Sequence, residues 1–213
     1  MLMHIDSFDQ YNADKDFSQM YNTFNNIRAL TDAGRFDGGC MQLLTTNSNL
    51  VWTCPTNELT NVWTGFALKI ANGQPIGKLV QFISLYGSEI KIQYDSISGI
   101  WQILNKSNTI IFTTLFGITS NTWHWIDIYF LFNNCGQIAL FADTIEIFDY
   151  LGNTISSDIQ SFSSIMIGDN QNESIYNTFI DDWYILSEIG DEHVNGFGDA
   201  QINTNISQTT EII

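Results

Sequence analysis

The chain has 213 residues, of which 44% are hydrophobic and 14% aromatic, and its 7 basic and 23 acidic residues give a formal net charge of -16. This charge argues against a nucleic-acid-binding protein, because binding a duplex requires lysine and arginine to neutralise phosphates, and it argues equally against attachment to an anionic membrane surface. The hydrophobic and aromatic content excludes a disordered chain and predicts a globular domain.

Apolar and polar residues alternate with a period of two along most of the chain, which is typical of strands with one face in water. The clearest case is the segment 88–96, where Ile90, Ile92 and Tyr94 alternate with polar residues. Turn-forming residues separate this segment from similar ones, which in chain order are 38–44, 65–70, 78–86, 99–104, 108–116, 122–132, 137–142, 144–150, 163–168 and 179–186. About a dozen short strands predict an all-β fold, a two-sheet antiparallel β-sandwich of the jelly-roll type.

No shift in composition marks an internal domain boundary, so we expect a single β-sandwich over residues 1–199 and a short polar extended arm over 200–213. The three cysteines are a poor disulfide framework, and the N-terminus lacks the basic and apolar regions of a signal peptide. The longest apolar stretch, 123–132, is shorter than the ~20 residues that span a bilayer. These features predict a protein that is made and folded in the cytoplasm.

The pair Asp181-Asp182 is the most conspicuous acidic feature in a strand pattern. Two carboxylates that act on one glycosidic bond must flank it, which on a single strand requires side chains on the same face, whereas the pleat of a strand sends adjacent side chains to opposite faces. The two aspartates therefore cannot act together without a bulge. The histidines His4, His124 and His193 stand in no nucleophile or metal motif, so we expect no enzymatic activity and assign no catalytic residue.

Calcium is the one cofactor for which the sequence offers ligands, because calcium binds oxygen atoms from loops and strand ends. If the first and last strands pair, Asp6 or Asp9 would meet Asp181 or Asp182. The alternative is that one aspartate accepts hydrogen bonds from a neighbouring loop while the other faces water. The remaining candidate oxygen ligands are Asp169 and Asp199.

Tryptophan side chains can stack on sugars, although most of the six tryptophans lie in strand patterns where packing in the core is expected. Trp52 and Trp63 flank the loop 54–61 and are the candidates for an exposed platform that binds glycans.

Several segments together resemble the concanavalin A-like, laminin-G-like jelly roll, namely "MHIDSFDQYN", "AGRFDGGCMQL", "WTGFALKI", "TWHWIDIYFLFNNCGQIALFADTIEIF", "SSIMIGDN" and "FIDDWYIL". The closing run "IDDWYILSEIGDEHVNGFGDAQINT" resembles the end of such domains in virion proteins of tailed bacteriophages.

This resemblance implies a non-enzymatic virion structural protein, either a head decoration or minor capsid protein or a tail-associated accessory protein. Such a protein would be located in the virion and would attach to capsid or tail subunits, as a homo-oligomer or in many copies. An extended arm can add a strand to a partner's sheet edge, or it can fold back along its own sheet. The residues expected to dock are Phe197, Gly198, Asp199, Ile202, Ile206, Ile212 and Ile213.

Two alternatives remain open at this point. The first is a carbohydrate-binding, lectin-like module of the same fold, with host-surface glycans as its partners. The second is a hydrolase whose acidic residues are brought together by loops.

Overall fold

The structure, a computed structural model, describes residues 2–11, 17–18, 20–21, 23–55, 59–84, 87–155, 161–169 and 171–187. No helix in this part of the chain is long and apolar enough to cross a membrane. Its strands are β1 (Leu2–Asp6), β2 (Thr23–Asn25), β3 (Ile27–Leu30), β4 (Cys40–Leu43), β5 (Asn49–Thr53), β6 (Asn61–Ile70), β7 (Gly77–Ser84), β8 (Gly87–Asp95), β9 (Ile100–Asn105), β10 (Ile110–Leu115), β11 (His124–Leu131), β12 (Gly136–Ala142), β13 (Ile145–Gly152), β14 (Ser164–Gly168) and β15 (Thr178–Ser187).

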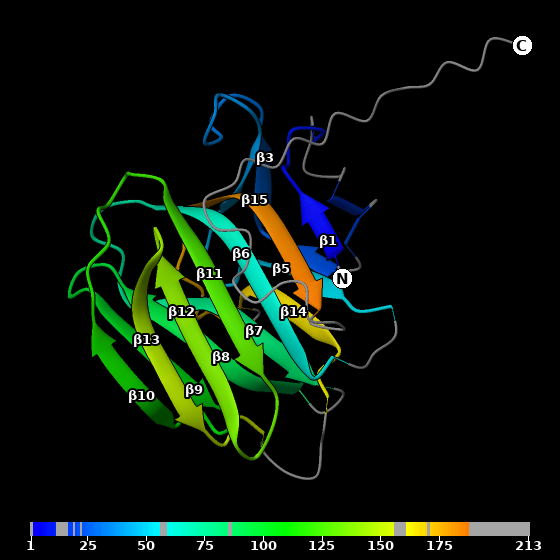
Figure 1. Cartoon of the computed structure of the whole chain (residues 1–213). Helices are drawn as coiled ribbons and strands as arrows, with labels where there is room; N and C mark the ends of the chain where they lie inside the picture. The colour runs from blue at the N-terminus through cyan, green and yellow to red at the C-terminus, as the bar shows by residue number, and fades with distance from the viewer. Residues whose placement is uncertain are drawn as a thin grey trace, which may run out of the picture.

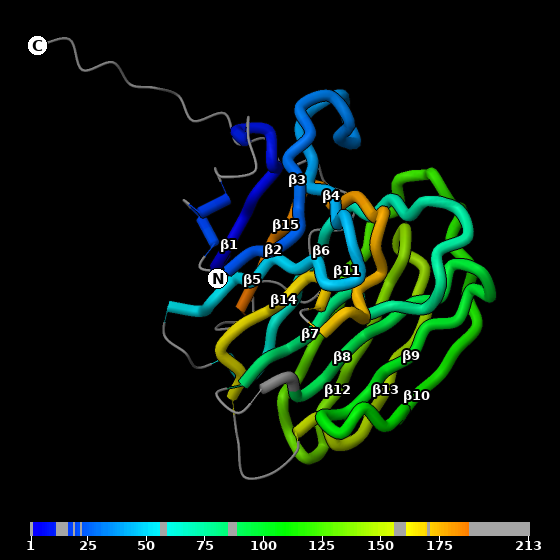
Figure 2. The backbone as a smooth tube through the Cα atoms, turned by 180° about the vertical axis from the view of Figure 1, so that it is seen from behind, coloured from blue at the N-terminus to red at the C-terminus, as the bar shows by residue number. Residues whose placement is uncertain are grey.

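The strands form two antiparallel sheets that lie face to face (Figures 1 and 2). The eight-stranded sheet has the order β13-β12-β11-β6-β15-β4-β3, and β1 pairs with β15 beside this path. The seven-stranded sheet has the order β10-β9-β8-β7-β14-β5-β2. The predicted two-sheet antiparallel β-sandwich is confirmed.

The inward-facing side chains of both sheets form one large hydrophobic core. In β8 these are Ile90, Ile92 and Tyr94, as the alternating pattern predicts. The sheets meet where the ring of Phe82 on β7 stacks on that of Phe130 on β11, with the ring centroids 4.1 Å apart. Burying one such side chain contributes about 1.5–3 kcal/mol to the free energy of unfolding.

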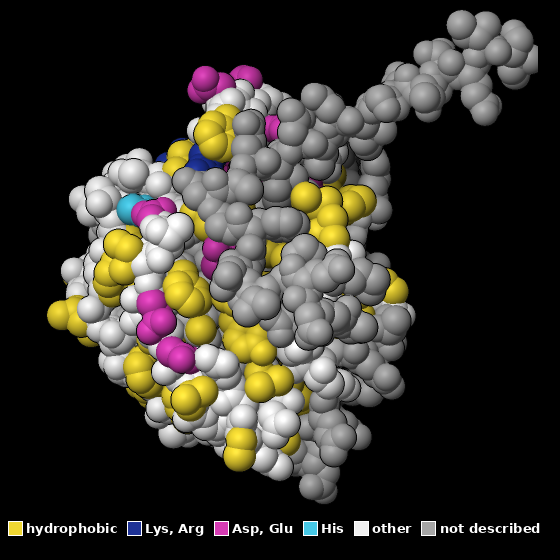
Figure 3. All heavy atoms as spheres, in the orientation of Figure 1, with side chains coloured by type: hydrophobic (Ala, Val, Ile, Leu, Met, Phe, Trp, Pro, Cys, Tyr) yellow, Lys and Arg dark blue, Asp and Glu magenta, His cyan; other side chains and the backbone are white. Residues whose placement is uncertain are grey.

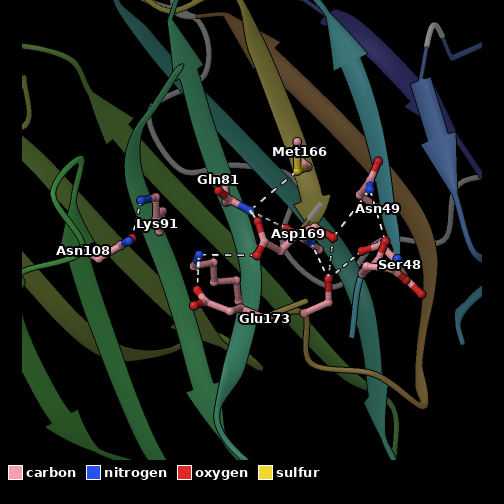
Figure 4. A network of polar contacts seen from close by, with 12 residues as sticks. Ser48, Asn49, Gln81, Lys91, Asn108, Met166, Asp169 and Glu173 are labelled. Carbon is pink, nitrogen blue, oxygen red and sulfur yellow. Dashed lines mark hydrogen bonds and ion pairs between the residues drawn. The ribbon is translucent and has the colours of Figure 1, made fainter. Parts of the chain in front are cut away.

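A buried polar network fixes the segment between β14 and β15 against β7 (Figure 4). The ammonium group of Lys78 forms ion pairs with Asp169, at 3.4 Å, and with Glu173. The side-chain amide of Gln81 donates to the Asp169 carboxylate at 2.9 Å, and the Ser174 hydroxyl donates to the backbone carbonyl of Ser48 at 2.6 Å. Because a buried charge is costly unless it is paired, we assign a structural role to this network.

The three cysteines, all within the described residues, form no disulfide. Cys40 and Cys54 are buried and Cys135 is exposed. The predicted arm at 200–213 lies outside the described residues.

Candidate functional site

The face of the eight-stranded sheet that points away from the core carries the chemically most distinctive side chains. Those side chains come from neighbouring strands β11, β6 and β15 and from the loop 31–39. Figure 3 shows hydrophobic side chains spread over this face, with acidic side chains among them. The outer-face site is defined here as Arg35, Lys69, Trp125, Asp127, Asp181 and Tyr184.

At the centre of the site, the carboxylate of Asp127 is held by two donors from the same face. One carboxylate oxygen accepts from the indole N–H of Trp125 at 2.9 Å, and the other accepts from the hydroxyl of Tyr184. Asp127 on β11 and Tyr184 on β15 both pair with Gly65 on the intervening strand β6. A Cβ atom at Gly65 would lie 2.4 Å from the Asp127 carboxylate and 2.4 Å from the Tyr184 ring. The missing side chain therefore lets the two groups meet across β6.

A bulge in β15 determines to which face of the sheet the side chains around Asp181 and Asp182 point. The register against β6 shifts between Asp181 and Tyr184, and Asp182 has a positive φ of 51°. The extra residue re-phases the strand, so that Ile180 and Trp183 both face the core although they are three residues apart. The sequence pattern alone predicts simple alternation along this strand, in which Asp181 and Tyr184 would lie on opposite faces. Because of the bulge, Asp181 and Tyr184 share the outer face.

The loop 31–39 covers Asp181. One carboxylate oxygen of Asp181 accepts from the backbone N–H of Arg35 at 2.8 Å, and the other accepts from the backbone N–H of Asp182 at 2.8 Å. A Cβ at Gly34 would lie 2.9 Å from this carboxylate and 2.4 Å from the carbonyl oxygen of Gly39, so the tight approach of the loop requires glycine at position 34.

Two cations rest on aromatic rings beside these acids. The guanidinium of Arg35 lies 5.5 Å from the ring centroid of Trp125. The ammonium of Lys69 lies 4.6 Å from the ring centroid of Trp123 and 4.7 Å from that of Phe179. Such cation–π contacts orient a long basic side chain, and the Lys69 ammonium also donates to the backbone carbonyl of Ala33 at 3.4 Å.

A third basic residue lies in line with Lys69. Lys69 pairs with Phe179, Phe179 with Gln42, and Gln42 with Arg28, on the successive strands β6, β15, β4 and β3. Cross-strand partners point to the same face of a sheet, so Arg28, which is exposed, lies on the same side as Lys69.

Burial shifts the acid–base properties of the site. It raises the pKa of Asp181 to about 7, and it raises the pKa of Asp127 against the opposing effect of the hydrogen bonds from Tyr184 and Trp125. Burial, with the nearby charge of Asp181, also raises the pKa of the Cys40 thiol to about 12. This thiol therefore stays protonated near neutral pH and is a poor nucleophile.

The two tryptophans that the sequence selects for glycan binding lie in different places. Trp63 is on the outer face but is only 7% exposed, and its ring centroid lies 5.1 Å from that of Tyr129 and 6.0 Å from that of Phe141. Trp52 is only 6% exposed and belongs to the main core, next to His4. The two side chains are therefore not brought together on one exposed platform.

The first and last described strands pair, as the calcium hypothesis supposes, with Asp6 opposite Trp183. The Asp6 carboxylate accepts hydrogen bonds from the backbone N–H of Phe8 and from the hydroxyls of Tyr11 and Tyr21, at 2.7–2.8 Å. In the part of the chain that the structure describes, no group of three or more His, Cys, Asp or Glu side chains is arranged to hold a metal ion. Calcium binding stays a prediction.

The other residues selected from the sequence lie elsewhere. His124 contacts Asp143, with 2.6 Å between the ring nitrogen and the carboxylate, and His4 contacts the hydroxyl of Tyr21 at 3.0 Å. His193 lies outside the described residues. The same holds for every residue expected to dock on virion partners, namely Phe197, Gly198, Asp199, Ile202, Ile206, Ile212 and Ile213.

Sequence reasoning did not find Arg35, Lys69, Asp127 or Tyr184. One signal for Asp127 was available, because it is the single charge within the apolar segment 125–132 and must be paired if it is buried. The glycine at position 65, inside an otherwise apolar strand pattern, is a second signal, because such a glycine often marks a close approach.

No protein-family model and no curated protein matches this sequence. Solved structures do match in fold. The endo-β-1,4-glucuronan lyase from the fungus Trichoderma reesei matches with a TM-score of 0.64 and 9% identity, over 88% of this chain and 96% of that one. The alginate lyase Aly36B, in complex with alginate trisaccharide, matches with a TM-score of 0.58 and 10% identity, over 86% and 97%.

The receptor-binding domain of a botulinum neurotoxin C/D mosaic serotype matches with a TM-score of 0.57 and 14% identity, over 87% of this chain and 47% of that one. At these identities the similarity establishes the fold. The jelly-roll β-sandwich in the resemblance drawn from the sequence is thereby supported, and a phage origin is not shown.

The comparisons contradict the prediction of a non-enzymatic virion structural protein. The two lyases, which the chain matches over nearly their whole length, are polysaccharide-degrading enzymes. The expectation that the chain lacks enzymatic activity is overturned by the same finding. The carbohydrate-binding alternative agrees better with these structures.

Proposed function

We propose that this chain binds acidic polysaccharides on the outer face of the eight-stranded sheet. One observation carries the proposal: Arg28, Arg35 and Lys69, three of only seven basic residues in the chain, gather at one end of a sheet face lined with aromatic rings.

The charges of the site favour a carboxylate ligand. Arginine and lysine donate charge-assisted hydrogen bonds to carboxylates, and arginine does so through two parallel N–H groups. Below pH 7 the Asp181 carboxyl is mostly uncharged, because burial raises its pKa to about 7. It then neither repels an anionic sugar nor neutralises the neighbouring cations.

The aromatic rings suit the sugar backbone of the ligand. Trp123, Tyr129, Phe141 and Phe179 are all half-buried on this face, so part of each ring is open to solvent. A flat apolar ring can cover the C–H face of a pyranose while the sugar hydroxyls reach water. Glucuronan and alginate, which the similar lyases act on or bind, are both polymers of sugar acids.

Titration calorimetry with polyglucuronate and alginate, and with dextran as a neutral polymer, tests this proposal. We expect Lys69→Gln and Arg28→Gln each to weaken binding of the acidic polymers about tenfold, the equivalent of about 1.4 kcal/mol. We expect the affinity to fall with added salt. Lys106→Gln is the control for loss of a positive charge on the other sheet, where Lys106 follows β9 and pairs with the buried Glu89 at 3.1 Å, so its binding is measured below the melting temperature of the variant. Equal losses in all three variants, or equal binding of dextran, would contradict the proposal.

A second candidate function is cleavage of the same polymers by elimination, and the acid–base groups of the site favour it. In this reaction a base removes the proton next to the sugar carboxylate, a C=C bond forms, and the glycosidic C–O bond breaks as its oxygen takes up a proton. Asp181, with a pKa of about 7, has the basicity of a general base at neutral pH, and the Tyr184 hydroxyl is a proton donor. Both side chains are buried, so the loop 31–39 must open before a substrate reaches Asp181.

Ultraviolet absorbance of the unsaturated product measures this activity directly. We expect wild-type protein to release such product from polyglucuronate or alginate, and Tyr184→Phe to lower the rate at least about 100-fold, the lower range for a general acid–base group. If wild-type protein binds the polymers and forms no product, elimination is excluded and binding stands.

A further inference from the structure

Side chains from both sheets line a cavity of about 330 Å³ where β9 leads into β10 and where β13 ends. Figure 1 shows β10 and β13 at the same margin of the molecule, and the ring centroids of Phe112 and Tyr150, one from each strand, lie 6.1 Å apart. Protein interiors contain few voids larger than a water molecule, and sites for small molecules begin at about 300 Å³. The cavity is therefore large enough for one small ligand.

Part of the lining is apolar and includes one aromatic ring. Ile90, Ile111 and Ile155 line the cavity together with Tyr150. The Tyr150 ring meets the ring of Phe112 edge-on, and a Cβ at Gly152 would lie 2.4 Å from the Tyr150 hydroxyl, so the glycine leaves room for the ring in this position. Tyr150 is half-buried. A partly open aromatic ring can stack on the C–H face of a sugar.

Two asparagine side chains in the lining are oriented by their own turns. The side-chain oxygen of Asn105 accepts from the backbone N–H groups of Ser107 and Thr109, both at 3.0 Å. The side-chain oxygen of Asn153 accepts from the backbone N–H of Ile155 at 3.0 Å. These bonds decide which end of each amide is the oxygen. The NH₂ group of each side chain is then the donor to a ligand.

The charges in the lining cancel, because one acidic and one basic residue occur among the described residues that line the cavity. The buried Glu89 carboxylate pairs with the Lys106 ammonium at 3.1 Å and accepts from the Ser84 hydroxyl at 2.7 Å. The backbone carbonyl of Lys106 accepts in turn from the Lys91 ammonium at 3.3 Å, and Lys91 also contacts Asn108 (Figure 4). A charged ligand would bring an unpaired charge to this balanced set, so the lining favours a neutral one.

We propose that this cavity binds one neutral sugar ring, a pyranose with free hydroxyl groups. The volume equals that of about ten water molecules at about 30 Å³ each, which is close to the number of non-hydrogen atoms in a hexose. A pyranose offers an apolar face to Tyr150 and hydroxyls that accept from Asn105 and Asn153 and donate to Glu89. A purely apolar ligand would take these polar groups out of water without pairing them. The cavity shares no residue with the outer-face site, and the inference does not rest on the proposed function.

Titration of the full chain with glucose, galactose and mannose, followed by the NMR shifts of its backbone amides, tests the proposal. We expect at least one of these sugars to shift the amides of residues 105–111 and 150–155 and to saturate with a Kd of about 1–10 mM, the weak affinity of a ligand with few atoms. Tyr150→Leu should weaken binding about tenfold through loss of the ring. Ile155→Trp should abolish saturation, because the larger side chain fills the cavity.

The matched control is Tyr176→Leu, which changes a half-buried tyrosine between β14 and β15 and should bind like the wild type. Melting temperatures show which variants are folded, and the two cavity variants are independent, so the test stands if one of them does not fold.

Glucuronate and glucosamine, the two charged probes, should shift the cavity amides at least about tenfold more weakly. Glucuronate that shifts Arg28 and Lys69 instead reports on the outer-face site, so the failure of one proposal is distinguishable from the failure of the other. Shifts that rise without saturation for all three neutral sugars, saturable shifts outside the cavity only, unchanged affinity in the folded cavity variants, or glucuronate bound in the cavity as tightly as the neutral sugars would each overturn the inference.

Discussion

Replacing Gly65 by alanine should lower the free energy of unfolding by about 2–6 kcal/mol. The added Cβ would lie 2.4 Å from both the Asp127 carboxylate and the Tyr184 ring, and no flexible side-chain end can give way there, because both groups are buried. Overpacking in a filled core costs about 1–3 kcal/mol, and separating Tyr184 from Asp127 leaves a buried carboxylate with one donor fewer, at a further cost of about 1–3 kcal/mol. Chemical denaturation monitored by tryptophan fluorescence measures the change.

Gly117→Ala is the control for this substitution. A Cβ at Gly117 would have no atom within 4 Å, and Gly117 has no positive φ that alanine would strain. The control should therefore unfold within about 0.5 kcal/mol of the wild type. If Gly65→Ala unfolds no more easily than Gly117→Ala, the contact between β11 and β15 across β6 does not hold the site together.

The second large effect concerns Asp181 and pH. Its pKa is about 7 in the folded chain and close to 3.8 when unfolded, so between these values the folded chain binds the proton more tightly. The contribution of protonated Asp181 to the free energy of unfolding is then fully present below about pH 4, and it is lost as the pH rises toward 7. A shift of about three units corresponds to about 4 kcal/mol. Relative to Asp181→Asn, the wild type should lose about this much stability between pH 4 and pH 7.5.

The same measurement on His4 should give a slope of the opposite sign. Burial lowers the pKa of His4 from 6.5 to about 4, so the unfolded chain binds the proton more tightly between these values. Relative to His4→Asn, the wild type should gain stability as the pH rises from 4 to 6.5.

A stability difference between wild type and Asp181→Asn that does not change with pH would show that Asp181 is already ionised in the folded chain at low pH.

The two aspartates of β15 show why a strand pattern can mislead. Alternation predicts that Asp181 and Asp182 diverge and cannot act together without a bulge. The bulge at Asp182 instead sets Asp181 on the face that carries Tyr184, and the loop 31–39 then buries it. The error lies in the register, because a single extra residue reverses the facing of every side chain that follows.

The functional prediction failed for a different reason. It relied on the closing run of the sequence, most of which lies outside the described residues, and on the absence of a sequence-local catalytic motif. Elements far apart in the chain build the outer-face site: Arg35 and Tyr184 are 149 positions apart, and Asp127 comes from a third segment. Local spacing carries no information about such a set.

The sequence by itself determined the class of fold. Period-two alternation, frequent turn residues and a high content of β-branched and aromatic side chains fix strands and their buried faces, because these are local properties of the backbone and of each side chain. Tertiary structure alone decided that β6 lies between β11 and β15, that Gly65 lets Asp127 meet Tyr184, and that Asp181 loses its contact with water. These features depend on which strands become neighbours and on how deeply each side chain is buried. Both are properties of the packed chain and not of any local segment.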